Sequence, residues 1–149
     1  MSRIALLAAA LAACPLVALA QQPEAAPSVA QFIDARQSKM GRSGRELYAI
    51  EQAISSGADI STLRQPVQWL VQWSEELPTL FPEGSHSQDG DTRLTIWSDA
   101  PGFAAATARF RMAIQALDTA AATNDRAVLR RAIRQVWNSC SSCHAAYTG

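Results

Sequence analysis

The segment Cys140-Ser141-Ser142-Cys143-His144 lies close to the C-terminus of this 149-residue chain. Two cysteines separated by two residues, with a histidine directly after the second, have the spacing that attaches a c-type haem. The thiols add to the haem vinyl groups as thioethers, and the imidazole takes an axial position on the iron. On a helix, the two cysteines and the histidine fall within one arc of about 100°. The segment therefore predicts one covalently bound haem c per chain, carried on the buried face of a helix.

Other uses of a Cys-x-x-Cys pair fit this sequence less well. A redox dithiol normally opens a helix, where the helix dipole lowers the thiol pKa, but this pair lies at a predicted helix end. A structural zinc site needs four ligands, and the only other histidine, His86, lies in a segment rich in Ser, Gly and Asp. A structural disulfide between the two cysteines is the third alternative.

Residues 1–20 are predicted to be a secretory signal peptide. Arg3 supplies a short positive start, residues 4–17 form an almost unbroken apolar run, and Ala18-Leu19-Ala20 has the small-x-small cleavage pattern. A polar segment follows at once. We expect cleavage after Ala20 and export to the periplasm, outside the cytoplasm, where bacteria attach haem.

A lipoprotein signal is the competing interpretation of this leader. Leu11-Ala12-Ala13-Cys14 resembles the lipidation box, which would leave a lipid on Cys14. Residues 15–20 argue against it, because they are apolar where a lipoprotein usually has a polar tether. Removal of residues 1–20 leaves one domain, residues 21–149, in which Cys140 and Cys143 are the only cysteines.

Four long amphipathic segments predict an all-α fold, an antiparallel four-helix bundle with the haem near the end of the fourth helix. The helices are expected at 29–56, with Ser28 as N-cap and Gly57 as the stop; from 59 or 61 to about 77; at 102–123; and from 123 or 124 to near the C-terminus. Residues 78–101 are predicted to be a long crossover loop with Leu80, Phe81, Leu94, Ile96 and Trp97 as its anchors. No segment alternates with period two, so we expect no strands.

Charge and aromatic residues suggest candidate surfaces. The chain has 13 basic and 13 acidic residues, a balance that gives no reason to expect nucleic acid as a partner. Arg126, Arg130 and Arg134 recur every fourth residue, beside Arg131, either as a solvated helix face or as a docking patch for an acidic redox partner protein. Trp69 and Trp73 stand four residues apart, and either pack in the core or form the interface of a homodimer.

The C-terminal residues 140–147 resemble those of class II cytochromes c, the family of cytochrome c prime and its low-spin relatives of the c-556 type. Residues 36–40 resemble the family's distal segment on the first helix, residues 77–84 the exit of its second helix, and residues 96–103 the end of its crossover. The resemblance covers all of residues 21–149. It implies a four-helix bundle with the haem motif on the fourth helix.

The resemblance also implies two distal residues. Arg36 matches the arginine that pairs with a haem propionate. Met40 matches the residue over the sixth iron position, which ligates iron in low-spin members and only blocks the site in cytochrome c prime. Small residues next to Met40, and Thr148 after Tyr147 where many gas-binding members have a basic residue, favour the low-spin type.

We therefore expect His144 and Met40 to ligate the iron, which would make a periplasmic outer-sphere carrier of one electron. The alternative is a high-spin, five-coordinate cytochrome c prime that binds NO or CO at the distal site. The sequence does not predict an enzyme, because a peroxidase needs a distal acid–base group and His86, in its loop, is a poor candidate.

Overall fold

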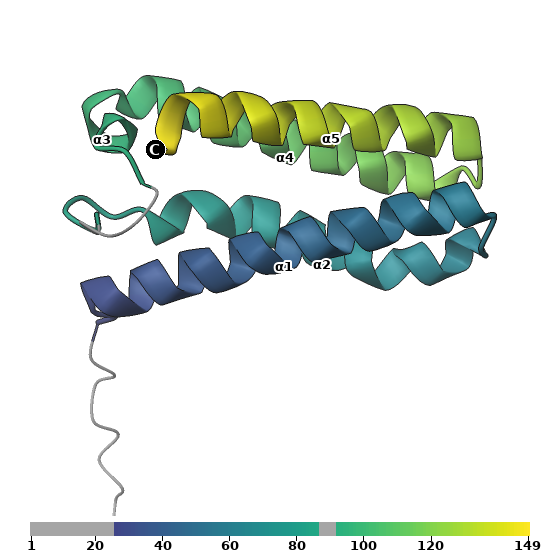
Figure 1. Cartoon of the computed structure of the whole chain (residues 1–149), viewed down its shortest axis with the longest axis horizontal. Coiled ribbons are helices and arrows are strands. Elements are labelled where there is room, and N and C mark those ends of the chain that lie inside the picture. Colours follow the sequence, from purple (N-terminus) through teal and green to yellow (C-terminus); the bar gives the residue numbers. More distant parts are fainter. Residues whose placement is uncertain (1–25, 87–91) are drawn as a thin grey trace, which may run out of the picture.

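The computed structural model describes residues 26–86 and 92–149, so the predicted signal peptide lies outside the described residues. Four long helices run antiparallel in two layers, α1 beside α2 and α4 beside α5 (Figure 1). The elements, in chain order, are α1 (Val29–Ser56), η1 (Ile60–Leu63), α2 (Arg64–Glu76), η2 (Leu77–Leu80), α3 (Thr95–Ser98), α4 (Ala100–Ala122) and α5 (Arg126–Tyr147). The predicted four-helix bundle is confirmed. The described residues form no strand beyond one isolated bridge, between Thr92 and Thr148.

The bounds of α1 follow from its capping residues, as predicted. The Ser28 hydroxyl accepts a hydrogen bond from the Gln31 backbone N–H at 3.3 Å, and the Gln31 side chain accepts one from the Ser28 N–H at 2.7 Å. This reciprocal pair is a capping box. At the other end Gly57 has φ 80°, a left-handed conformation that glycine adopts at little cost, and its N–H donates to the Ala53 carbonyl.

The start of the second helix also agrees with the prediction. Asp59 caps the short helix η1, which leads directly into α2, and Pro66 lies in the first turn of α2, where its missing N–H is tolerated. The predicted inward side chains are all buried; these are Leu63, Val67, Leu70 and Leu77.

The described part of the connection after α2 contains more helix than the predicted loop 78–101, of which residues 87–91 lie outside the described residues. It contains η2 and α3, and α4 begins at Ala100 because the Asp99 carboxylate accepts the Gly102 N–H at 3.1 Å. Leu80 and Ile96 are buried anchors, but the prediction for Leu94 is wrong, since 63% of it is exposed. Trp97 is half-buried, and its Nε1 donates to the Phe81 carbonyl at 3.1 Å.

The last helix, α5, begins two to three residues later than predicted. Asp125 accepts hydrogen bonds from the N–H groups of Ala127 at 2.7 Å and Val128 at 3.1 Å, so it is the N-cap. Asn124 before it has φ 55°, which makes a tight turn between α4 and α5.

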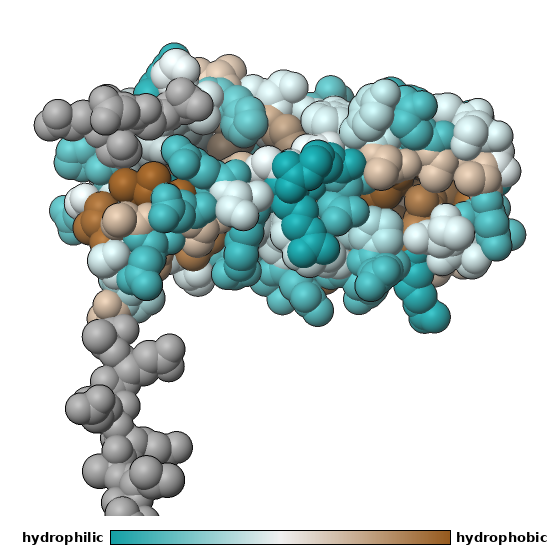
Figure 2. All heavy atoms as spheres, turned by 60° about the horizontal axis from the view of Figure 1, so that its bottom comes forward, coloured by the Kyte–Doolittle hydropathy of each residue, from teal (hydrophilic) through white to brown (hydrophobic). Residues whose placement is uncertain are grey.

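The apolar core fills the half of the bundle nearest the α1–η1 and α4–α5 turns. Its fully buried members include Leu47, Ile50, Ile54, Leu70, Ile114, Leu117, Leu129, Ile133 and Val136. Figure 2 shows one face of the molecule, on which apolar residues are exposed near the end where α1 begins and again near the opposite end. The half of the bundle that holds these fully buried residues is tightly packed, and the other half is more open.

The two tryptophans of α2 have different environments. Trp73 is only 2% exposed and belongs to the core, whereas Trp69 is half-buried and stacks on it with ring centroids 6.3 Å apart. The Arg42 guanidinium covers the Trp69 ring at 4.1 Å. Trp73 is thus packed in the core, as one of the two interpretations predicted. Because its ring is buried, it is not available for a homodimer interface.

Arg126 is not part of a solvated arginine face. Its guanidinium donates to four carbonyl groups at the C-terminal end of α1, those of Ala53, Ile54, Gly57 and Ala58, with distances of 3.4, 3.3 and 2.9 Å to the first three. A cation at this end also interacts favourably with the helix dipole. The side chain thus joins α5 to α1. Arg130, Arg131 and Arg134 are exposed and remain candidates for docking.

Replacing Arg126 is expected to destabilise the bundle. Arg126→Met keeps most of the side-chain length but removes the donors, and we expect the free energy of unfolding to fall by about 1–3 kcal/mol, the usual cost of losing hydrogen bonds from a charged group. Urea unfolding followed by circular dichroism measures it. Arg130→Met on the exposed face of the same helix is the matched control and should change stability by less than about 0.5 kcal/mol. Equal effects of the two substitutions would contradict the capping role.

Candidate haem site

The three residues of the C-terminal motif lie together near the end of α5. Cys140 and Cys143 are half-buried, and His144 is exposed to solvent on the adjoining side of the helix. The two cysteines do not form a disulfide. Their thiols are therefore available for thioether bonds, and the predicted alternative of a structural disulfide does not occur in this structure.

A small apolar cavity of about 110 Å³ lies beside these residues, within the open half of the bundle. It is enclosed by three of the long helices, α1, α4 and α5, and by Leu77, the first residue of η2. Its lining residues are Met40, Ser43, Gly44, Leu47, Leu77, Thr107, Phe110, Trp137, Ser139, Cys140, Cys143 and His144.

A second cavity of about 460 Å³ adjoins the first. The two share Met40, Leu77, Cys143 and His144, and the larger one extends past Arg36 and Phe81 to Tyr147 and the C-terminus. Together they have the size usual for a site that binds a cofactor. All five residues predicted for the site line one or both cavities: Arg36, Met40, Cys140, Cys143 and His144.

The thiols have raised pKa values in the folded chain. Burial, together with the neighbouring Cys143, raises the pKa of Cys140 to about 11. Burial also raises the pKa of Cys143, against an opposing effect of Arg109. Because the thiolate is the nucleophile, both cysteines are weak nucleophiles at neutral pH in the folded chain.

Arg36 is a buried cation whose partners are neutral. It is 4% exposed, and it donates to the Leu80 carbonyl at 3.2 Å and to the Ser85 hydroxyl at 2.8 Å, and also to the Ser85 carbonyl. Its guanidinium lies 4.7 Å from the centroid of the Phe81 ring. Burial lowers its pKa. Within the described part of the chain, no ion pair includes it. A carboxylate in the larger cavity would therefore complement Arg36.

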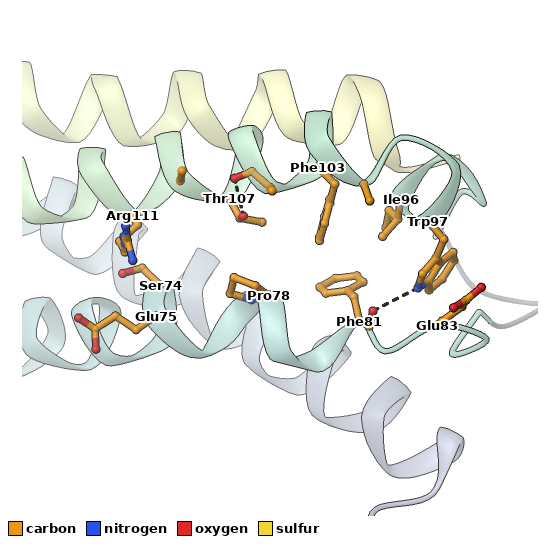
Figure 3. Close-up of a pocket in the computed structure, with 13 residues that line it drawn as sticks. Ser74, Glu75, Pro78, Phe81, Glu83, Ile96, Trp97, Phe103, Thr107 and Arg111 are labelled. Atoms are coloured by element: carbon orange, nitrogen blue, oxygen red, sulfur yellow. Dashed lines mark hydrogen bonds between the residues drawn. The ribbon is translucent and has the colours of Figure 1, made fainter.

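Aromatic residues separate the larger cavity from an outer groove of about 520 Å³ between α2 and α4 (Figure 3). Phe81, Ile96 and Phe103 line both spaces. The Phe81 and Phe103 rings meet edge to face with centroids 4.9 Å apart, and Figure 3 shows them projecting toward each other from opposite walls of the groove. Glu75, Glu83 and Arg111 supply charged groups to the lining of the outer groove.

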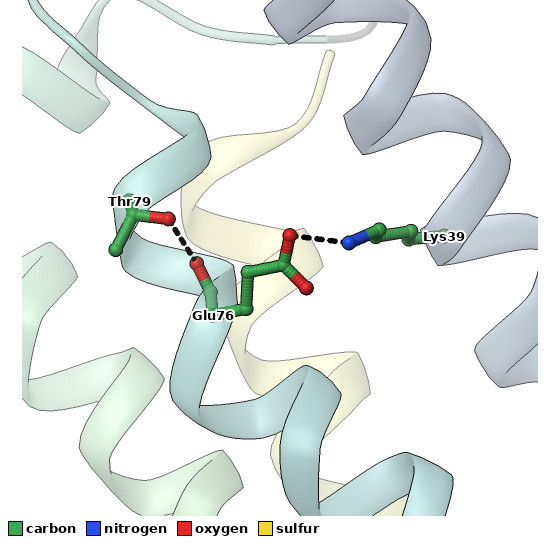
Figure 4. A network of polar contacts seen from close by, with 3 residues as sticks. All are labelled: Lys39, Glu76 and Thr79. Atoms are coloured by element: carbon green, nitrogen blue, oxygen red, sulfur yellow. Dashed lines mark hydrogen bonds and ion pairs between the residues drawn. The ribbon is translucent and has the colours of Figure 1, made fainter. Parts of the chain in front are cut away.

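An ion pair joins α1 to α2 beside the cavities. Lys39 bonds to the Glu76 carboxylate, and the Thr79 hydroxyl donates to the Glu76 carbonyl at 2.7 Å (Figure 4). The two charged residues directly precede Met40 and Leu77, which line both cavities. Both are partly exposed, so the pair contributes about 1 kcal/mol at most, and its main effect is on the register of the two helices.

The C-terminal turn of α5 is tied to the residues that precede α4. The Tyr147 hydroxyl donates to Asp99 Oδ2 at 2.9 Å, and Arg93 Nη1 donates to the Ala145 carbonyl at 3.2 Å. Burial raises the pKa of Tyr147, and its hydrogen bond to Asp99 raises it further. These contacts fix the turn that carries His144. Sequence reasoning missed them, because they join residues about 50 positions apart.

Comparison with known proteins identifies the family. Residues 31–148 match the family model described as Cytochrome C′. The chain belongs to the cytochrome c′ family. It is 26% identical to cytochrome c′ of Rhodospirillum rubrum over 95% of both chains. It is 36% identical to that of Rubrivivax gelatinosus over 77 residues, which cover 50% of this chain and 60% of that protein.

Solved structures of cytochromes c′ have the same fold. One superposes with a TM-score of 0.77 at 27% identity, and covers 84% of this chain and 100% of its own. A second, a nitric oxide complex of a point mutant of cytochrome c prime from Alcaligenes xylosoxidans, has a TM-score of 0.75 at 29% identity and covers 80% of this chain and 95% of its own. The class II family is thus confirmed, and the c-556 subtype stays a prediction.

Haem c, covalently attached in cytochromes c′, is the cofactor of this chain. The residues fit this cofactor. Two free thiols and an imidazole lie on one helix, apolar side chains enclose the adjoining space, and the buried cation Arg36 borders the larger cavity. His86 stacks edge-on against Trp97 with centroids 6.1 Å apart and is not among the residues that line the two cavities. Among the described residues, no helix is both long enough and apolar enough to span a membrane.

Gly102 allows the contact between Asp99 and Tyr147. A Cβ atom there would lie 2.1 Å from Asp99 Oδ2 and 2.6 Å from the Tyr147 hydroxyl oxygen. We expect Gly102→Ala to lower the free energy of unfolding by about 1–3 kcal/mol, the usual cost of overpacking. Denaturant unfolding of the holoprotein measures the effect.

Gly41→Ala is the matched control for this prediction. Gly41 is exposed in α1, and its added Cβ would meet only the Arg45 guanidinium, at 3.4 Å. Because alanine favours a helix, this substitution is expected to stabilise the protein by up to about 1 kcal/mol. If Gly102→Ala also stabilised it, the close packing of Asp99 and Tyr147 would be contradicted.

Proposed function

We propose that this chain is a periplasmic cytochrome c′ whose five-coordinate haem iron binds a small uncharged gas, NO or CO. The observation that carries the proposal is that Met40, from α1, and His144, from α5, border the same two cavities. One solved relative, with 29% identity, is a nitric oxide complex. The match to the cytochrome c′ family and the nitric oxide complex of that relative favour the gas-binding alternative over the electron carrier that the sequence suggested.

Each predicted residue then has a defined part in holding the cofactor. Cys140 and Cys143 would form the two thioethers, His144 would bind the iron, and Arg36 would pair with a propionate. Bound haem would supply an iron that can hold one small ligand. The spacing of the motif on α5 supports the first three roles, and the buried, unpaired charge of Arg36 supports the fourth.

Met40 is proposed to border the distal site without a bond to iron. It is half-buried, and Ser43 and Gly44 lie one turn further along α1 in the wall of the same small cavity. A flexible thioether next to small residues can yield to an entering molecule. The mostly apolar wall disfavours charged ligands, because a charge there would lose its hydration.

The second candidate is an outer-sphere electron carrier in which Met40 is the sixth ligand. The observation in its favour is that Met40 is the one thioether among the residues that line the two cavities. A redox partner protein would then dock on Arg130, Arg131 and Arg134, which are exposed on α5.

Location and assembly belong to the same proposal. Residues 1–20 would be removed as a signal peptide during export, and residues 21–149 would function in the periplasm without a catalytic residue. A homodimer stays a prediction, for which Trp69 offers a half-buried aromatic ring.

Replacement of Met40 separates the two candidates. We expect the wild-type holoprotein to be high-spin and to bind CO when reduced. In Met40→Ala, CO should bind about tenfold faster, which corresponds to a barrier lower by about 1.4 kcal/mol, because the side chain no longer obstructs the site. Absorption spectra and flash photolysis measure both properties.

Met112→Ala is the control, since Met112 lies on α4 with 65% of its surface exposed, away from both cavities. It should leave the CO kinetics unchanged. A low-spin wild type that binds CO only after Met40 is replaced would refute the gas-binding proposal and support the carrier.

A further inference from the structure

The two layers of the bundle (Figure 1) differ in charge. Helices α1 and α2 carry five basic and five acidic residues, so their layer is neutral. Helices α4 and α5 carry six arginines and a single acidic residue, Asp118, which accepts a hydrogen bond from Gln68 of α2 at 2.8 Å. Within the described part of the chain, no ion pair includes any of these arginines. The layer of α4 and α5 is therefore strongly cationic.

A surface groove of about 450 Å³ lies between α4 and α5, and we call it the α4–α5 groove. Arg109 lines it from α4, and Arg131 lies one turn before the lining residue Gln135 on the same stripe of α5. Both arginines are exposed. None of the described residues that line the groove is acidic. Its walls include Arg109, Met112 and Ala116 of α4 and Gln135, Asn138 and Ser142 of α5.

The α4–α5 groove lies next to the residues proposed to bind the haem. Ser139 lines both the groove and the small cavity that Cys140 borders. Ser142, in the groove wall, directly precedes Cys143. Because haem c would be bonded to these two cysteines, the haem edge that carries the thioethers would lie behind this wall. Electron transfer slows steeply as two redox centres move apart, so a partner in the groove would have a short path to the haem.

The other spaces near the cofactor lack this positive charge. Among the described residues that line the larger cavity, Arg36 is the only Arg, Lys, Asp or Glu, and it is buried. The outer groove between α2 and α4 has two carboxylates, those of Glu75 and Glu83, against Arg111. Exposed charges attract a partner over about a Debye length, which is about 8 Å at physiological ionic strength. An anionic protein surface is therefore attracted to the α4–α5 groove more than to either of the other two spaces.

We propose that the α4–α5 groove is the docking surface for an electron-donating protein with an acidic surface. One electron passes from the donor, which is oxidised, to ferric haem, which is reduced to the ferrous state, and no atom is transferred. Arg109 and Arg131 hold the partner over the wall that contains Ser139. The docking surface thus spans two helices and is not confined to the exposed arginines of α5. The proposal depends on the bound haem and is independent of gas binding and of a bond between Met40 and iron.

Charge reversal tests the docking surface. The probe is a reduced plant-type ferredoxin, a one-electron donor of low potential that is chosen for its acidic surface. In the double variant with Arg109→Glu and Arg131→Glu, we expect the second-order rate constant for reduction of the ferric holoprotein at low ionic strength to fall at least tenfold. Its dependence on salt should become weaker, because the attraction is lost. Stopped-flow absorption measures both quantities.

The double variant with Arg45→Glu and Arg64→Glu is the matched control. These two arginines are exposed on α1 and α2, so their reversal changes the net charge by the same amount in the neutral layer. It should slow the reduction by less than about threefold. Equal slowing in the two double variants would show an effect of net charge alone and would overturn the docking surface.

Binding without electron transfer gives a second readout. When the two oxidised proteins are mixed, the amide NMR signals of Ala116 and Asn138 should shift, and added salt should reverse the shift. Shifts at the larger cavity instead, at Gln37 and Thr92, or no shift at all, would overturn the proposal. This measurement on the wild type decides even if the charge-reversed variant does not fold. A holoprotein that binds neither NO nor CO would refute the proposed function and leave this test unaffected.

Discussion

Cys140, Cys143 and His144 lie on one face of α5, and all three have to border the space that receives the cofactor. The first half of α5 buries Leu129, Ile133 and Val136 in the core, whereas Cys140 and Cys143 are half-buried and His144 is exposed. Helix α1 has the reverse order along the chain. Its first half contains Met40, which borders the cavities, and its second half lies in the core. Because α1 and α5 are antiparallel, the boundary between core and cavity lies at the same level of the bundle on both helices (Figure 1). One end is therefore packed tightly, and the other is left for the cofactor.

Polar contacts stabilise the open end, where apolar packing is sparse. Arg36 joins α1 to residues 80–85, and Lys39 joins it to α2. Tyr147 joins the end of α5 to the residues before α4. At the packed end, by contrast, one side chain, Arg126, satisfies the carbonyl groups that end α1. Hydrogen bonds are directional, so such contacts fix the backbone around a cavity that side chains do not fill.

The sequence predicted what depends on local chemistry. Ser28 and Gly57 bound α1 through their own backbone and side-chain preferences, and the cysteine spacing identified the cofactor. The sequence did not predict contacts between distant segments. Arg126, for example, belongs to a series of arginines at every fourth residue that resembles a solvated helix face, yet its side chain caps the end of α1. Trp137 was missed for a different reason. Its spacing of three from Cys140 and seven from His144 puts it on the haem face, but an apolar residue there is hard to distinguish from a core residue until the structure shows it in the wall of the small cavity.

Five-coordination of the iron, with His144 bonded and Met40 close by but unbonded, is the central claim of this account. X-ray absorption at the iron edge of the ferric holoprotein tests it directly, because sulfur scatters differently from nitrogen at the distance of a direct bond. The account predicts only the porphyrin nitrogens and one imidazole nitrogen around the iron. A sulfur scatterer that disappears in Met40→Ala would contradict it.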